Sequence, residues 1–105
     1  MSRLKYEWDE NKNKKNIENH HISFELAVKV FSDPYRMDLY DEEHSGINPY
    51  GEWEDRYNTI GYIGDLLFVV YTVRAEHHDE IIRIISARPA VGIEIEDYIR
   101  NRGMI

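Results

Sequence analysis

The sequence contains no cysteine and no apolar run near the roughly 18 residues that a membrane-spanning helix requires. Disulfides and thiolate zinc sites are therefore excluded, and a reducing compartment is the natural expectation. The opening stretch MSRLKYEWDENKNKK is too polar for a secretory signal, so we expect a cytoplasmic protein with no membrane partner. The 105 residues, of which 42% are hydrophobic, suffice for one core, and we predict a single domain over residues 1–105.

Lysine is absent after position 29, and the segment 38–55 has no lysine or arginine. That segment, DLYDEEHSGINPYGEWED, holds seven acidic residues and accounts for the whole net charge of −7. An acidic balance argues against nucleic-acid binding. Every basic residue beyond Lys29 is an arginine, however, and arginine is preferred where a planar group must grip a carboxylate or a phosphate. Ordinary ion pairing with the many acids is the alternative interpretation.

The first third of the chain predicts a short strand and two helices. The strand-like piece KYEWD precedes a polar helix over about residues 10–20, for which Asp9 is a good N-cap. Ser23 caps a second predicted helix, FELAVKVF, whose apolar residues fall at helical spacing and give it one buried face. The SDP stretch at 32–34 ends that helix.

The remainder predicts strands and one last helix. YRMDLYD has the alternating character of a strand, residues 41–55 read as a loop, and RYNTIGYI, LLFVVYTVR and IIRIISAR are strands. Pro89 is predicted to open a final helix that runs to about Arg102. Consecutive strands with short links form an antiparallel meander. We therefore predict an α+β fold, an antiparallel meander with two N-terminal helices and one C-terminal helix packed on it.

Four arginines occupy the predicted strands. Because side chains alternate along a strand, Arg83 and Arg88 are predicted on opposite faces, with Arg83 on an open face. We expect Arg56, Arg74 and Arg88 to approach one end of the sheet. A buried guanidinium without a partner is too costly, so each arginine must meet water, an acid or a ligand phosphate. The candidate acidic partners are Glu52, Glu54, Asp55 and Glu94.

Four segments form a specific set: WDENKNKKNIENHHISFELAVKVFSDP, EDRYNTIG, LLFVVYTVR and RIISARPA. Together they resemble the BrnT family of type II toxins, whose pattern includes W-D-x-x-K-x-x-x-N, K-H-G-[IV]-S-F-x-x-A, a DP pair, E-x-R-x-x-x-[IG]-G, T-x-R, R-I-I-S-A-R-x-A and a late E-x-x-x-Y. The match runs from about Trp8 to Tyr98. Asn19 and His21 depart from it, since the family commonly has lysine and glycine at those places.

The resemblance implies a RelE-like fold and a metal-independent endoribonuclease that needs no cofactor and blocks translation. It implies a BrnA-like antitoxin partner, which neutralises the toxin in a hetero-oligomer and carries most of the contact of that complex with operator DNA. The alternative is a degenerate toxin, a non-catalytic antitoxin-binding component of a DNA-bound autorepressor. The acidic charge favours this alternative, because RNA affinity depends on basic contacts.

The resemblance also implies the site residues. The candidate catalytic residues are His20, Glu54, Arg56, Arg83 and Arg88, and the candidate RNA-binding residues are Arg74, Tyr98 and Lys12. Histidine and glutamate transfer protons, and arginine stabilises the charge of a pentavalent phosphate, so His20 or Glu54 is the predicted base. No metal site is predicted, because no histidine or carboxylate stands at ligand spacing on a predicted helix.

Two of these residue choices have structural alternatives. His20 can instead cap the C-terminus of the first helix, where a cation is favoured. Tyr98 can instead pack the last helix on the sheet. Tyr50 and Trp53, in the acidic segment, are candidate apolar anchors for a protein partner, because aromatic residues dominate interface hot spots.

Overall fold

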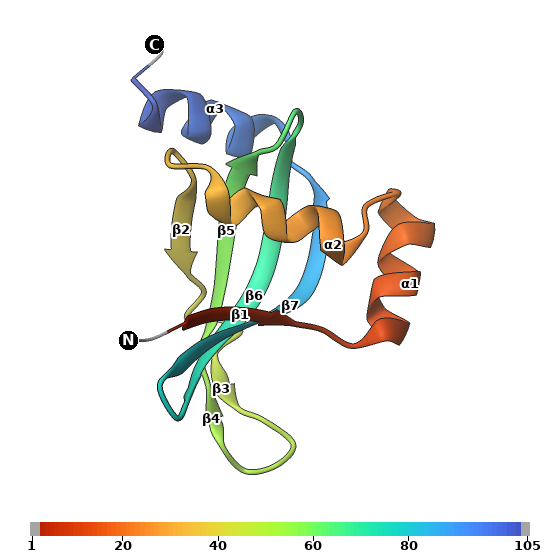
Figure 1. Ribbon diagram of the computed structural model, residues 1–105. Helices are drawn as coiled ribbons and strands as arrows, with labels where there is room; N and C mark the ends of the chain where they lie inside the picture. The colour runs from red at the N-terminus through yellow and green to blue at the C-terminus, as the bar shows by residue number, and fades with distance from the viewer. Residues whose placement is uncertain (1–2, 104–105) are drawn as a thin grey trace.

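In a computed structural model, which describes residues 3–103, helices flank a five-stranded sheet (Figure 1). The elements in chain order are β1 (Arg3–Glu7), α1 (Glu10–His20), α2 (Phe24–Ala27), the 3-10 helix η1 (Val28–Ser32), β2 (Met37–Tyr40), β3 (Gly46–Ile47), β4 (Trp53–Glu54), β5 (Arg56–Tyr62), β6 (Leu66–Glu76), β7 (Asp79–Pro89) and α3 (Gly92–Asn101). The strand order of this sheet is β1-β7-β6-β5-β2, and β3 and β4 form a separate two-stranded sheet. The α+β class and the β5–β6–β7 meander are confirmed.

The prediction of two N-terminal α-helices needs correction. Helix α1 forms as expected, because the Asp9 carboxylate accepts from the backbone N–H groups of Asn11 and Lys12 at 2.8 and 3.2 Å. The second segment is α-helical for only four residues, α2, and then tightens into η1. The β-branched Val28 and Val30 and the following Asp33 and Pro34 explain why the α-helix does not continue.

Two asparagines of α1 connect the N-terminal helices to the sheet. Asn16 is 6% exposed and donates its Nδ2 to the carbonyl oxygens of Ile22 and Ala87, both at 2.8 Å, while its Oδ1 accepts from the Ala87 N–H at 3.1 Å. Since β1 pairs with β7 only at residues 79–83, the Asn16 amide takes the place of a neighbouring strand farther along β7. Asn13 similarly accepts from the N–H of Phe24 at 2.8 Å.

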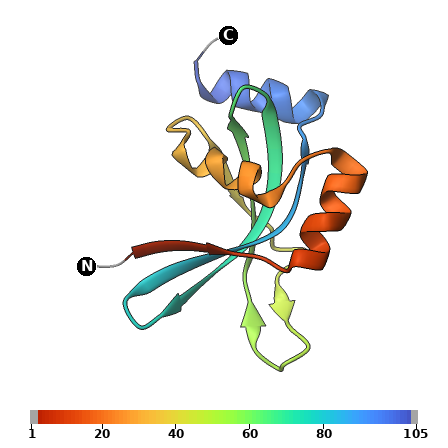
Figure 2. The same cartoon turned by 45° about the vertical axis from the view of Figure 1, so that its right-hand side comes forward.

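The core lies between the helices and one face of the sheet. Phe24, Val30, Val69 and Ile84 are fully buried there. Phe31 adds an edge-to-face contact with a β6 tyrosine at 5.0 Å between ring centroids. Each large apolar side chain buried in this way contributes about 1.5–3 kcal/mol. Figure 2 shows α1 and α2 beside the sheet, and α3 at the end of the molecule opposite the β3–β4 hairpin.

Several strand predictions also change. The predicted loop 41–55 contains the β3–β4 hairpin, whose turn is closed by Asn48 N–H donating to the carbonyl of Glu52 at 2.8 Å. β1 pairs with β7 in parallel, which the meander prediction did not include. Pro89 is the last residue of β7 and does not open α3, because it still pairs with Leu67 on β6. No helix within residues 3–103 is long and apolar enough to cross a membrane.

Candidate functional site

A β-bulge places the strand arginines on one face of the sheet. The register between β6 and β7 shifts between Val70 and Tyr71, so the side-chain alternation of β7 changes after Ile84. Ala87 therefore points into the core with Ile84, and Arg88 lies on the same face as Arg83. The prediction that Arg83 and Arg88 lie on opposite faces is wrong, because simple alternation does not allow for the bulge.

Three of the four arginines, Arg56, Arg74 and Arg83, lie on the half of this open face that is nearer the β6–β7 turn. Thr72 on β6 is opposite Arg56 on β5 and Arg83 on β7. Arg83 is also opposite Glu7 on β1. Residues directly opposite one another on neighbouring strands point to the same side, so the four side chains form a row across the sheet. Arg74, two residues beyond Thr72 on β6, points to that same side.

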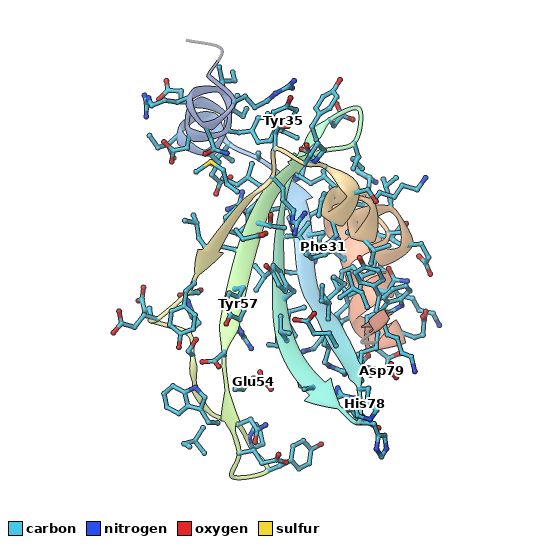
Figure 3. All side chains as sticks on the ribbon, turned by 60° about the vertical axis from the view of Figure 1, so that its left-hand side comes forward. Phe31, Tyr35, Glu54, Tyr57, His78 and Asp79 are labelled. Carbon is cyan, nitrogen blue, oxygen red and sulfur yellow. The ribbon has the colours of Figure 1, made fainter. Side chains whose placement is uncertain are left out.

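Between this row and the β3–β4 hairpin lies a cleft of about 530 Å³, called here the arginine cleft. Arg74, Arg83 and Thr72 line it from the sheet, and Tyr50 and Trp53 line it from the hairpin. Figure 1 shows this hairpin and the β6–β7 turn projecting from the same end of the sheet, and Figure 3 shows Glu54 near the base of the hairpin. The indole N–H of Trp53 donates to Oδ1 of Asp55 at 2.8 Å, and Trp53 is 62% exposed.

Each arginine of this face has an acidic partner. Arg74 pairs with Glu7 and with Glu76, Arg83 lies 3.6 Å from Glu7, and Arg56 lies 3.4 Å from Glu54. Of the acids considered from the sequence, Glu54 and Glu94 are partners of these arginines, whereas Asp55 binds aromatic side chains. The acids that line the cleft are Glu7, Glu52, Glu54 and Asp55. Acidic residues therefore outnumber the two arginines that line it.

Arg88 lies at the other end of the open face, which corrects its predicted position beside Arg56 and Arg74. β7 runs antiparallel to β6, so the end of β7 meets the start of β6, and Arg88 is opposite Phe68. Phe68 and Thr72 are four residues apart, which corresponds to ~13 Å along the strand. Arg88 holds α3 in place through two hydrogen bonds to Glu94, at 2.8 and 2.9 Å, and its guanidinium covers the Phe68 ring.

The pKa values of this pair follow from their contacts. The hydrogen bond to Glu94 raises the pKa of Arg88. Burial alone would raise the pKa of the Glu94 carboxyl, but hydrogen bonds from Arg88 and from the Val91 N–H outweigh burial and lower it. Both groups are thus held in their charged forms, as a structural pair requires.

Tyr98 belongs to the core. It is 2% exposed, and its hydroxyl donates to Oδ2 of Asp33 at 2.6 Å. Burial and this hydrogen bond raise the pKa of Tyr98 to about 12. Burial also acts to raise the pKa of Asp33, but hydrogen bonds from Tyr98, the Tyr62 N–H and the Tyr35 N–H outweigh it and lower that pKa. A ring so enclosed has no free face for a base, so we leave Tyr98 out of the proposed site.

His20 and Lys12 lie at opposite ends of α1. His20, at the last position of the helix, lines a separate hollow of about 610 Å³ with residues of the β5–β6 turn and is not brought together with the arginine cleft. Lys12 is in the first turn. Hydrogen bonds from the backbone of Lys12 and Asn11, and then the charges of Lys12 and Arg83, lower the pKa of Asp9.

A second, smaller hollow of about 290 Å³ lies on the open face. Arg56, Asn58 and His44 line it, and the His44 ring is paired with Asp41 at 2.8 Å. Sequence reasoning missed both His44 and Glu7. The alternation of Tyr6 and Glu7 would have placed Glu7 outward, but only the parallel pairing of β1 brings it to Arg83. Within residues 3–103, no group of three or more histidine and acidic side chains is arranged to hold a metal ion.

The chain matches the model of a known protein family. A family model described as "Ribonuclease toxin, BrnT, of type II toxin-antitoxin system" matches residues 8–94, which is most of the chain. The matched range includes α1, all of β5–β7 and the four strand arginines. No curated protein matches the chain.

Proposed function

Because the chain belongs to the BrnT family of ribonuclease toxins of type II toxin–antitoxin systems, we propose that it cleaves RNA without a metal ion, blocks translation in the cytoplasm and is neutralised by a cognate antitoxin. The observation that carries the proposal is the row of Arg56, Thr72 and Arg83 on an open sheet face, beside a cleft. The RelE-like fold that the resemblance implies is part of the same proposal.

The proposed reaction uses the 2′-hydroxyl of the substrate as the nucleophile. Arg83 and Arg74 bind the phosphate and stabilise its developing charge, because guanidinium groups donate two parallel hydrogen bonds to such oxygens. Glu54 removes the 2′-OH proton, and Arg56 holds the Glu54 carboxylate at 3.4 Å. Glu7 keeps Arg74 and Arg83 oriented until the phosphate replaces it.

The remaining residues predicted from the sequence have other roles in this proposal, or none. Lys12, in the first turn of α1, is proposed to contact the RNA backbone. Arg88 is proposed to hold α3 through Glu94. His20, which lines a separate hollow, is not given a part in the chemistry.

The antitoxin is proposed to cover the arginine cleft. Tyr50 and Trp53 are 87% and 62% exposed at its edge, and Ile47 on the same hairpin is 68% exposed. An exposed apolar group of this kind is typical of a protein interface. The seven acids of segment 38–55 favour a basic partner. We propose a BrnA-like antitoxin that also links the hetero-oligomer to operator DNA.

The ends of the cleaved RNA test this reaction directly. RNA recovered from a cell-free translation reaction containing the protein is expected to carry 2′,3′-cyclic phosphates and 5′-hydroxyls, since attack by the 2′-oxygen leaves these ends. Fragments with 5′-phosphates would contradict the mechanism. Arg83→Ala is expected to abolish the fragments. Arg100→Ala, which removes a 66%-exposed arginine from α3, is the matched control and is expected to leave them unchanged.

A second candidate is a non-catalytic antitoxin-binding component of a DNA-bound autorepressor. The acidic lining of the arginine cleft and the pairing of every strand arginine with an acid favour it. Intact RNA and undisturbed translation in the same reaction would select this candidate.

A further inference from the structure

The smaller hollow contains a histidine, which the arginine cleft lacks. His44 lies beside Arg56 and Asn58, and its Nδ1 is 2.8 Å from Oδ2 of Asp41. A carboxylate only accepts hydrogen bonds, so this contact requires the proton on Nδ1 and leaves Nε2 as the free ring nitrogen. Such an aspartate–histidine pair fixes the orientation of the imidazole.

Backbone hydrogen bonds fix this pair at the start of β5. The Asp41 N–H donates to the carbonyl of Arg56 at 2.8 Å, and the Arg56 N–H donates to Ser45 Oγ at 2.8 Å. The other carboxylate oxygen of Asp41 accepts from the His44 N–H at 3.2 Å. The Asp41 side chain is only 21% exposed, whereas that of His44 is 60% exposed and open to a substrate.

Arg56 connects the smaller hollow to the arginine cleft. Its guanidinium pairs with Glu54, which lines the cleft, and its side chain lines the smaller hollow with His44. Arg56 Nε and Asn58 Oδ1 are buried and have no hydrogen-bond partner within residues 3–103. Such atoms are uncommon in folded proteins and call for a functional or solvent partner.

The proposed reaction also needs a proton for its leaving group. Guanidinium groups do not give up their protons, so none of the arginines can supply it. Histidine is the residue most often used for proton transfer at neutral pH. Arg56 links His44 to the proposed base, because it pairs with Glu54 and lines the smaller hollow together with His44.

We propose that His44 is the general acid of RNA cleavage and that Asp41 is its positioning residue; this inference rests on the proposed function. Glu54 takes the 2′-OH proton while the 2′-oxygen bonds to phosphorus. The bond from phosphorus to the 5′-oxygen breaks, and the proton on Nε2 of the His44 imidazolium passes to that oxygen. A 2′,3′-cyclic phosphate and a 5′-hydroxyl result, and proton exchange with water restores both side chains.

The first test compares cleavage rates of one RNA with wild-type protein, His44→Ala and His78→Ala. His78 is an exposed histidine in the β6–β7 turn and serves as the control. His44→Ala is expected to slow cleavage at least ~100-fold, the usual contribution of a general acid, with free imidazole restoring part of the rate. Asp41→Asn is expected to lower kcat with little change in KM.

The second test separates proton transfer from a structural effect. In an RNA with sulfur in place of the bridging 5′-oxygen at the mapped cleavage position, the leaving thiolate needs no proton. His44→Ala is therefore expected to cut this RNA nearly as fast as the wild type. Equal slowing on both RNAs would overturn the proposal, as would full activity of His44→Ala, or loss of activity with His20→Ala alone. A wild-type protein that cuts no RNA would overturn the proposed function itself.

Discussion

Replacing Asn16 by alanine tests how α1 is held against the sheet. The substitution removes two hydrogen bonds to carbonyl oxygens and one from an N–H, and it leaves the polar groups of Ile22 and Ala87 without partners. Each buried polar group left in this way costs about 1–3 kcal/mol. Alanine recovers about 0.5 kcal/mol through its higher helix propensity. With three such groups, we therefore expect Asn16→Ala to lose at least about 2.5 kcal/mol of the free energy of unfolding.

Urea denaturation followed by far-UV circular dichroism measures this loss. A total stability of about 5–15 kcal/mol is typical, so the midpoint should fall clearly. Thermal unfolding should shift by at least roughly 10 °C. Asn11→Ala is the matched control, because Asn11 is an exposed asparagine of the same helix and gains the same propensity. If Asn16→Ala unfolds within 1 kcal/mol of Asn11→Ala, the Asn16 amide does not act as a strand neighbour and the reasoning is refuted.

Three further predictions concern Asp33, the αL residue His21, and the arginines. Asp33→Asn should lower the free energy of unfolding by about 1–2 kcal/mol at neutral pH. Because folding lowers the pKa of Asp33 from its ordinary 3.8, this difference from wild type should be complete above that pH and should disappear on acidification. Urea titrations at several pH values would show it. His21 has a φ of 59°, so His21→Gly should raise the unfolding free energy by up to about 1 kcal/mol, whereas His20→Gly, inside α1, should lower it. Arg88→Ala should lower the free energy of unfolding by about 1 kcal/mol and leave folded protein able to cut RNA. Arg83→Ala should abolish cleavage and leave the free energy of unfolding nearly unchanged. Denaturation and cleavage assays on both variants would test this contrast.

Local sequence signals predicted much of the fold. The caps at Asp9 and Ser23 both form hydrogen bonds where expected, and the apolar runs of β6 and β7 form adjacent central strands. The loss of α-helix after Ala27 and the hairpin at 46–54 were not visible, because short elements depend on tertiary contacts more than on propensity. The parallel pairing of β1 joins residues more than seventy positions apart, and nothing local in the sequence indicates it.

The candidate site was predictable in its residue types but not in its geometry. Arg56, Arg74 and Arg83 were identified from the strands, and Glu54 from its place in the motif. A one-residue bulge decided the face of Arg88, and strand direction decided its end of the sheet. His44 stayed unnoticed because it lies in an acidic stretch that reads as a loop, and its partner Asp41 becomes significant only when both lie beside Arg56.

The most direct test of the central claim is the length profile of RNA in a cell-free translation reaction. Wild-type protein, Arg83→Ala and Arg100→Ala are added in equal amounts, and the RNA is sized as translation is followed. The account predicts new fragments and arrested translation with wild type and Arg100→Ala, and intact RNA with Arg83→Ala. Intact RNA and normal translation with all three would contradict the assignment of a ribonuclease. Fragments with all three would contradict the placement of its site on the open face of the sheet.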